Sequence, residues 1–129
     1  MKILHSLILG EQGEDLLILH GFLGMGDNWK TYAKRLTPNG FRVHLIDQRN
    51  HGRSFWEPKF SYNSMAQDIV EYCGYHNLNN IIVLGHSMGG KVAMHLACYH
   101  NQLLKGFIVA DIAPKKYNPH HQLCLLYTS

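Results

Sequence analysis

The 129-residue sequence has no long apolar run and few charged residues. Since no stretch of about 20 apolar residues occurs, we predict no membrane-spanning helix. Charged residues make up 16% of the chain and hydrophobic residues 46%. That balance is typical of a globular core and not of a disordered segment. A chain of this length is expected to form one domain at most.

The sequence also lacks a large net charge. Twelve lysines and arginines face nine acidic residues, for a formal net charge of +3. The basic residues are scattered along the chain, and no basic stripe with interleaved aromatic residues occurs. We therefore expect no nucleic-acid partner.

Cysteine is scarce as well. Cys73, Cys98 and Cys124 are an odd number without framework spacing, so a disulfide scaffold is not expected and a reducing compartment fits better. The apolar N-terminal run is interrupted by His5 and Ser6, and no small-residue cleavage site follows it. We interpret this run as a first strand and not as a signal peptide, and we expect a cytoplasmic enzyme.

The ten histidines form no metal-binding pattern. The sequence contains no H-x-H, no H-E-x-x-H and no cysteine pair at ligand spacing. His120 and His121 are adjacent, so their rings would point in different directions on a helix or strand. We predict no metal site and no cofactor.

Short apolar runs alternate with helical patterns along the chain. The runs lack polar alternation, which is typical of strands buried on both faces of a parallel sheet. We predict strands over Ile3–Leu9, Leu16–Leu19, Arg42–Ile46, Ile81–Leu84 and Phe107–Ala110. We predict helices over Asn28–Leu36, Ser61–Tyr75 and Met88–His100. The alternation indicates an α/β fold with an initial hairpin and a doubly wound, mostly parallel sheet, here incomplete because no further βα unit follows residue 115.

The sequence Gly85-His86-Ser87-Met88-Gly89-Gly90 fits the pattern G-x-S-x-G between an apolar strand and an amphipathic helix. A serine on such a sharp turn is lifted above the sheet, and small residues two before and two after it let strand and helix approach. The N–H of Met88 would lie at a helix N-terminus, where the helix dipole favours negative charge. We predict Ser87 as a nucleophile and the Met88 N–H as an oxyanion donor.

A second candidate is the loop His20-Gly21-Phe22-Leu23-Gly24, which directly follows the second strand. A loop at the carboxyl end of a parallel strand faces the same crevice as the nucleophile turn. The backbone N–H of Phe22 is therefore the expected second oxyanion donor. For the His20 side chain we favour a structural role.

Together with the run from Asp47 to Ser54, these two motifs occur in an order that resembles the α/β-hydrolase superfamily. The sequence is more narrowly similar to small abhydrolase-type esterases and acyl-CoA thioesterases, and the run from Ala110 to Pro114 strengthens that resemblance. In the family, the loop over residues 47–54 resembles a structural turn that braces the site entrance. His51 is accordingly not expected to be the catalytic base.

The resemblance implies a Ser–acid–His triad and an acyl-enzyme on Ser87 that water releases. The implied substrate is a small-molecule acyl ester or thioester. Asp111, at the end of the fifth strand, is the implied acid, although many relatives of this fold place the acid one strand later. The superfamily's catalytic histidine comes after the last strand, and the only histidines after Asp111 are His120 and His121, where a lid would begin.

We therefore expect a truncated chain that is inactive by itself. Residues 1–123 would be the N-terminal part of a hydrolase domain. Residues 124–129 do not continue the family pattern and can be back-translated as a transposon-end sequencing adapter, so we expect a non-native tail. A non-catalytic ligand-binding protein with a hydrolase-like fold is the alternative from another class, and a lyase or C–C bond hydrolase of the same fold also stays open.

Overall fold

A computed structural model describes residues 2–110 of the chain. Asp111, His120, His121 and the expected boundary after residue 123 lie outside the described residues.

Five strands form one sheet in the order β1-β3-β2-β4-β5. Their bounds are Ser6–Leu9 (β1), Glu14–Leu19 (β2), Phe41–Ile46 (β3), Ile81–His86 (β4) and Leu104–Ala110 (β5). All neighbouring pairs are parallel except β1 with β3. The expected mostly parallel sheet is thus confirmed, and the carboxyl ends of β2, β3, β4 and β5 meet at one edge.

The expected initial hairpin is wrong. Strand β1 pairs antiparallel with β3, with Ser6 opposite Ile46, and β2 lies between β3 and β4. The reason is burial. The end of β2 from Leu16 to Leu19 is buried throughout, so β2 needs a neighbour along each edge, whereas β1 is only half buried and suits the outer edge.

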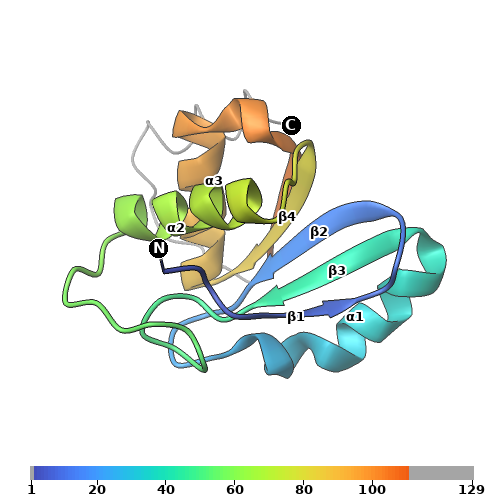
Figure 1. The fold of residues 1–129 in the computed structure, drawn as a ribbon, viewed down its shortest axis with the longest axis horizontal. Helices are drawn as coiled ribbons and strands as arrows, with labels where there is room; N and C mark the ends of the chain where they lie inside the picture. Colours follow the sequence, from blue (N-terminus) through green and yellow to red (C-terminus); the bar gives the residue numbers. More distant parts are fainter. Residues whose placement is uncertain (1, 111–129) are drawn as a thin grey trace.

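Helices cover both faces of this sheet (Figure 1). The helix α1 (Lys30–Leu36), preceded by the 3₁₀ turn η1 (Gly26–Trp29) and followed by η2 (Thr37–Asn39), packs on one face. The helices α2 (Tyr62–Tyr75) and α3 (Met88–Tyr99) pack on the other face, and the 3₁₀ turn η3 (Asn101–Leu103) links α3 to β5. The hydrophobic core is accordingly divided into two layers by the sheet, as in doubly wound folds.

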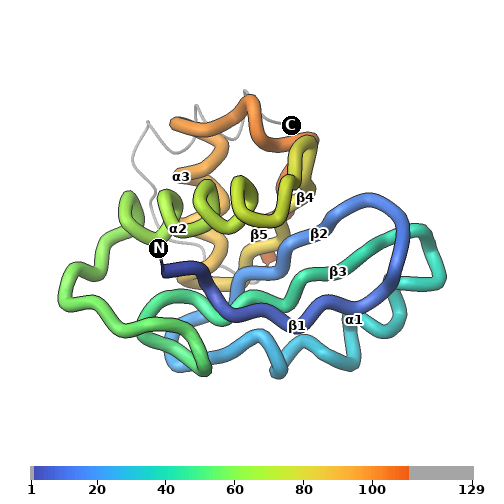
Figure 2. The backbone as a smooth tube through the Cα atoms, in the orientation of Figure 1, coloured from blue at the N-terminus to red at the C-terminus, as the bar shows by residue number. Residues whose placement is uncertain are grey.

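The start of helix α2 is fixed by a side-chain cap. Ser61 is its N-cap, and the Ser61 Oγ accepts a hydrogen bond of 3.1 Å from the backbone N–H of Ser64. The backbone trace shows that the loop before α2 runs beside the loop that follows β2 (Figure 2), and the Leu23 N–H donates to His51 Nε2 across this contact. Both loops therefore reach the edge at which the parallel strands end.

Two further findings concern single residues. Cys73 in α2 is a free cysteine, and burial raises the pKa of its thiol to about 12. Cys98 in α3 is half buried. Among residues 2–110, no helix has both the length and the apolar character needed to cross a bilayer.

Candidate active site

Ser87 lies between β4 and α3 on a backbone that few residues adopt. Its φ of 54° and ψ of −114° lie outside the favoured regions for an L-residue. The close approach of strand and helix depends on two glycines. A Cβ on Gly85 would lie 2.2 Å from the carbonyl oxygen of Gly89, and a Cβ on Gly89 would lie 2.1 Å from the carbonyl oxygen of Leu19. The G-x-S-x-G spacing is therefore required by contact and not only by turn preference.

The Ser87 side chain is exposed while the residues on both sides of the turn are largely buried. It opens onto a cavity of about 530 Å³. The other lining residues come from the loop after β2, the start of α2 and the first turns of α3: Phe22, Phe60, Ser61, Tyr62, Met65, Met88 and Lys91. The surface beside the hydroxyl is thus mainly apolar and aromatic, and Lys91 carries the one charge among these lining residues.

The N-terminus of α3 points at the same place. The Ser87 carbonyl accepts the N–H groups of Gly90 at 2.9 Å and Lys91 at 3.2 Å. The N–H groups of Met88 and Gly89, at the start of the helix, have no carbonyl within the helix to bind. They are free to bind a negative charge that develops beside the Ser87 hydroxyl.

The loop from His20 to Gly24 lies directly beside the turn. A Cβ on Gly21 would lie 3.3 Å from the Cβ of Ser87. The Gly21 carbonyl accepts two hydrogen bonds, from the Gly24 N–H at 3.0 Å and from His20 Nδ1 at 2.8 Å. Because a trans peptide is planar and its N–H points opposite to its C=O, these bonds also fix the direction of the Phe22 N–H.

His20 is buried and bonded at both ring nitrogens. Its Nε2 accepts the Gln48 N–H at 2.9 Å, so Nδ1 carries the proton that is donated to the Gly21 carbonyl. Burial is the main reason that the pKa of His20 lies below its ordinary value, which favours the neutral ring. The predicted structural role of His20 agrees with these bonds.

The loop over residues 47–54 braces the site, as its resemblance to a structural turn implies. The Asp47 carboxylate accepts the Gly26 N–H at 2.7 Å and the Arg53 N–H at 3.1 Å. His51 holds the neighbouring loop, because its Nε2 accepts the Leu23 N–H at 3.1 Å while Nδ1 bonds the Arg49 carbonyl. Because both ring nitrogens of His51 are hydrogen-bonded to backbone groups, neither is available to take a proton from Ser87.

Sequence reasoning missed one ion pair behind this loop. Arg49 donates from Nε and Nη2 to the two carboxylate oxygens of Asp68 in α2, at 2.6 Å and 2.8 Å. Both side chains are largely buried, and the pair raises the pKa of Arg49. The two residues are 19 positions apart on different elements, so no local pattern could have joined them.

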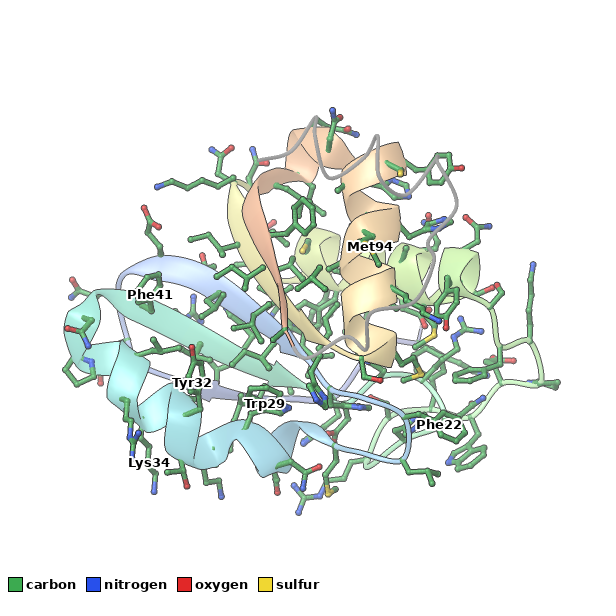
Figure 3. The ribbon with its side chains drawn as sticks, turned by 180° about the vertical axis from the view of Figure 1, so that it is seen from behind. Phe22, Trp29, Tyr32, Lys34, Phe41 and Met94 are labelled. Carbon is green, nitrogen blue, oxygen red and sulfur yellow. The ribbon has the colours of Figure 1, made fainter. Side chains whose placement is uncertain are left out.

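The exposed Phe22 side chain was also missed. Figure 3 shows it beyond the strand ends, away from Trp29 and Tyr32 on the α1 side of the sheet. Phe22 lines the cavity beside Ser87 and also a second cavity of about 370 Å³, which Trp29 and His86 line as well. Phe22 is 63% exposed, and it contributes to the lining of both cavities.

Within residues 2–110, no three histidine, cysteine or acidic side chains are placed together so as to hold a metal ion. The predicted acid Asp111 lies outside the described residues. Strand β5 ends at Ala110, which pairs with His86, the residue before Ser87.

A family model described as the alpha/beta hydrolase fold matches residues 16–125, which is most of the chain. The chain belongs to the α/β-hydrolase family. The match includes the Ser87 turn and the loop after β2.

Several relatives and solved structures are similar to this α/β-hydrolase chain. A protein from Cyberlindnera fabianii named ethanol acetyltransferase 1 is 38% identical over 89% of the chain and 35% of its own length. A putative esterase/lipase from Haemophilus influenzae is 37% identical over 79% of the chain, and 35% of that protein is covered. A structure titled marine microorganism esterase has 47% identity and a TM-score of 0.85, over 95% of this chain and 48% of that one. The chain thus spans about a third of the length of these two curated relatives.

Proposed function

We propose that the protein is a serine hydrolase that cleaves carboxylic esters or thioesters through an acyl-enzyme on Ser87. The observation that carries this proposal is the exposed Ser87 hydroxyl on strained backbone, at the start of α3 and at the wall of a cavity. Strained non-glycine backbone persists only where the surrounding structure holds it, and such residues cluster at functional sites. The names of the relatives, esterase and esterase/lipase, support the same chemistry.

The reaction follows from the placement of these groups. Ser87 Oγ attacks the substrate carbonyl carbon and passes its proton to a base, while the carbonyl oxygen becomes an oxyanion. The N–H groups of Met88 and Phe22 bind the oxyanion, and one such donor contributes about 3–4 kcal/mol of transition-state stabilisation. The tetrahedral intermediate then expels the alcohol or thiol, which takes the proton from the base. Water attacks the acyl-enzyme in the same manner and releases the acid.

In this proposal the base is a histidine outside residues 2–110. His20, His44 and His51 each have both ring nitrogens bonded to other groups. We propose Asp111 as the acid that orients this histidine. The support is that β5 delivers the chain to the level of His86, directly before Ser87.

Steady-state hydrolysis by the full-length protein tests the proposal. A 4-nitrophenyl ester and the matching aryl thioester are compared for the unmodified protein, for Ser87→Ala and for Thr31→Ala. Thr31 lies in α1 and its loss deletes a hydroxyl on the other face of the sheet. We expect Ser87→Ala to lower kcat at least about a thousandfold and Thr31→Ala to leave it unchanged. Equal activity of all three proteins overturns the proposal, and activity on only one substrate selects between ester and thioester.

A second candidate is acyl transfer to an alcohol, which the relative named ethanol acetyltransferase favours. The acyl-enzyme on Ser87 is the same, and an alcohol oxygen replaces water in the second step. Product analysis in water containing ethanol separates the two functions. A transferase gives mostly the ethyl ester, whereas a hydrolase gives mostly the acid.

A further inference from the structure

The charge that lines the cavity beside Ser87 is positive only. Lys91 is the single charged residue among those lining it, and no acidic side chain lines it. Among the ion pairs formed within residues 2–110, none includes Lys91. The ammonium instead lies 5.8 Å from the ring centroid of Tyr62, which also lines the cavity.

Two helix N-termini add to this positive charge. Ser61 and Tyr62 begin α2, Ser87 and Met88 begin α3, and all four line the cavity. Each helix N-terminus is equivalent to roughly half a positive charge. Since one N-terminus is used for the oxyanion, the start of α2 and the Lys91 ammonium remain to attract a second negative group.

The position of Lys91 indicates where this second negative group would lie relative to the reacting carbonyl. Lys91 lies in the first turn of α3, where its N–H donates to the Ser87 carbonyl at 3.2 Å, and both residues line the same cavity. Long side chains on a helix lean toward its N-terminus, which directs the Lys91 stem toward Ser87. A negative group close to the scissile carbonyl is therefore within reach of the ammonium.

We propose that Lys91, together with the N-terminus of α2, binds a substrate carboxylate, so that the preferred substrates are esters or thioesters carrying a carboxylate close to the scissile carbonyl. This inference rests on the proposed function of Ser87. A charge-assisted hydrogen bond of this kind is worth about 1.5–3 kcal/mol, which corresponds to roughly tenfold to a hundredfold in affinity. Lys91 is thus a specificity residue, and the reaction at Ser87 does not require it.

Two substrate pairs test the inference on the full-length protein and show on which side of the ester the carboxylate lies. Monoethyl succinate is compared with ethyl levulinate for the acyl side, because the second replaces the carboxylate with a methyl ketone of similar shape. Acetoxyacetate is compared with acetol acetate for the alcohol side. We expect the anionic member of one pair to have the higher kcat/KM. Lys91→Met lowers the anionic-to-neutral ratio about tenfold or more, and Lys91→Arg preserves it.

The matched control is Lys34→Met, which removes an exposed lysine of α1 on the other face of the sheet (Figure 3). It leaves the ratio unchanged under the proposal. A ratio that Lys91→Met leaves unchanged in both pairs overturns the inference, while the activity itself still supports the function of Ser87.

Binding to Ser87→Ala protein gives a readout that needs no turnover. Calorimetric titration compares monoethyl succinate and acetoxyacetate with their neutral partners, in the presence and absence of the additional change Lys91→Met. Tighter binding of at least one anionic ester, lost with Lys91, supports the inference even if the protein hydrolyses none of the four esters. Equal binding of anionic and neutral members overturns it.

Discussion

Gln48, in the loop that follows β3, donates two hydrogen bonds to His20, in the loop that follows β2. The Gln48 backbone N–H donates to His20 Nε2 at 2.9 Å, and the Gln48 side-chain amide donates to the His20 carbonyl at 2.7 Å. The His20 ring in turn bonds the Gly21 carbonyl. Both peptides that precede Phe22 are therefore fixed by buried groups, and the direction of the Phe22 N–H depends on them.

We predict that Gln48→Leu lowers kcat for ester hydrolysis about tenfold to a hundredfold with little change in KM. The substitution frees the His20 carbonyl and allows the Phe22 N–H to turn away, and a displacement of about 1 Å costs on the order of a hundredfold. The freed His20 carbonyl loses its donor, so we also expect a loss of about 1–3 kcal/mol of unfolding free energy. Part of this loss is offset, because leucine removes the buried Gln48 Oε1, which has no partner within residues 2–110. Steady-state kinetics and thermal melts measure both effects.

The control for this prediction is Gln102→Leu, in the exposed turn η3. It alters neither kcat nor the melting temperature under this account. A Gln48→Leu protein with unchanged kcat would show that the Phe22 N–H does not depend on these bonds.

The glycines of the Ser87 turn give a matched pair for stability. Gly89→Ala places a Cβ 2.1 Å from the Leu19 carbonyl oxygen, so strand and helix must separate, at a cost of about 1–3 kcal/mol. Gly74→Ala in α2 meets nothing within 4 Å and is expected to stabilise the protein by about 0.5–1 kcal/mol through helix propensity. Urea unfolding measures both, and a Gly89→Ala protein as stable as Gly74→Ala contradicts the described approach.

The Arg49–Asp68 pair allows a test by comparing a single with a double substitution. Arg49→Met leaves the buried Asp68 carboxylate without its partner, and we expect a loss of about 3–5 kcal/mol of unfolding free energy. Arg49→Met combined with Asp68→Leu removes both charges and recovers much of that loss. If the double variant is less stable than Arg49→Met alone, the buried charge is not the source of the cost.

Stability is expected to fall as the pH decreases below about 6.5. Burial is the first cause that lowers the pKa values of His20, His44 and His76 in the folded state. The unfolded chain therefore takes up protons at a higher pH than the folded chain does. The stability that the neutral rings provide is present above the unfolded pKa near 6.5 and is lost as the pH falls toward the lowered folded values.

His44 is the residue with which to test this dependence. Its side chain is fully buried between Asp15 at 2.8 Å and the Tyr72 hydroxyl at 2.7 Å, and Arg42 and His76 are the other charged or titratable groups that act on it. His44→Gln retains a polar side chain that does not titrate. We expect denaturant midpoints of this variant to change less between pH 7.5 and pH 5.5 than those of the unmodified protein, and an equal or steeper change would contradict the assignment.

The strands and the Ser87 turn were predictable because their signals are local. Continuous apolar runs located all five strands, and the structure lengthens β4 to His86 and starts β5 at Leu104. The helix predicted over Ser61–Tyr75 begins one residue later, at Tyr62, because Ser61 is its N-cap. The partner of β1 was not predictable from a local pattern, because strand order depends on the burial of β2 between β3 and β4.

The parts of the site that sequence reasoning missed are long-range contacts. Gln48 reaches His20 over 28 positions, and Lys91 approaches Tyr62 from a different helix. Neither pair has a sequence spacing that encodes the contact. What the sequence provides is the loop at each strand end, and packing decides which side chains of these loops meet.

The most direct test of the central claim is covalent labelling of the full-length protein with a fluorophosphonate, followed by peptide mass spectrometry. The reagent reacts with an activated serine hydroxyl whose tetrahedral adduct is stabilised by oxyanion donors. The account predicts stoichiometric modification at Ser87 and none in Ser87→Ala. An unmodified Ser87 in a folded full-length protein, or equal labelling of Ser87→Ala, would contradict it.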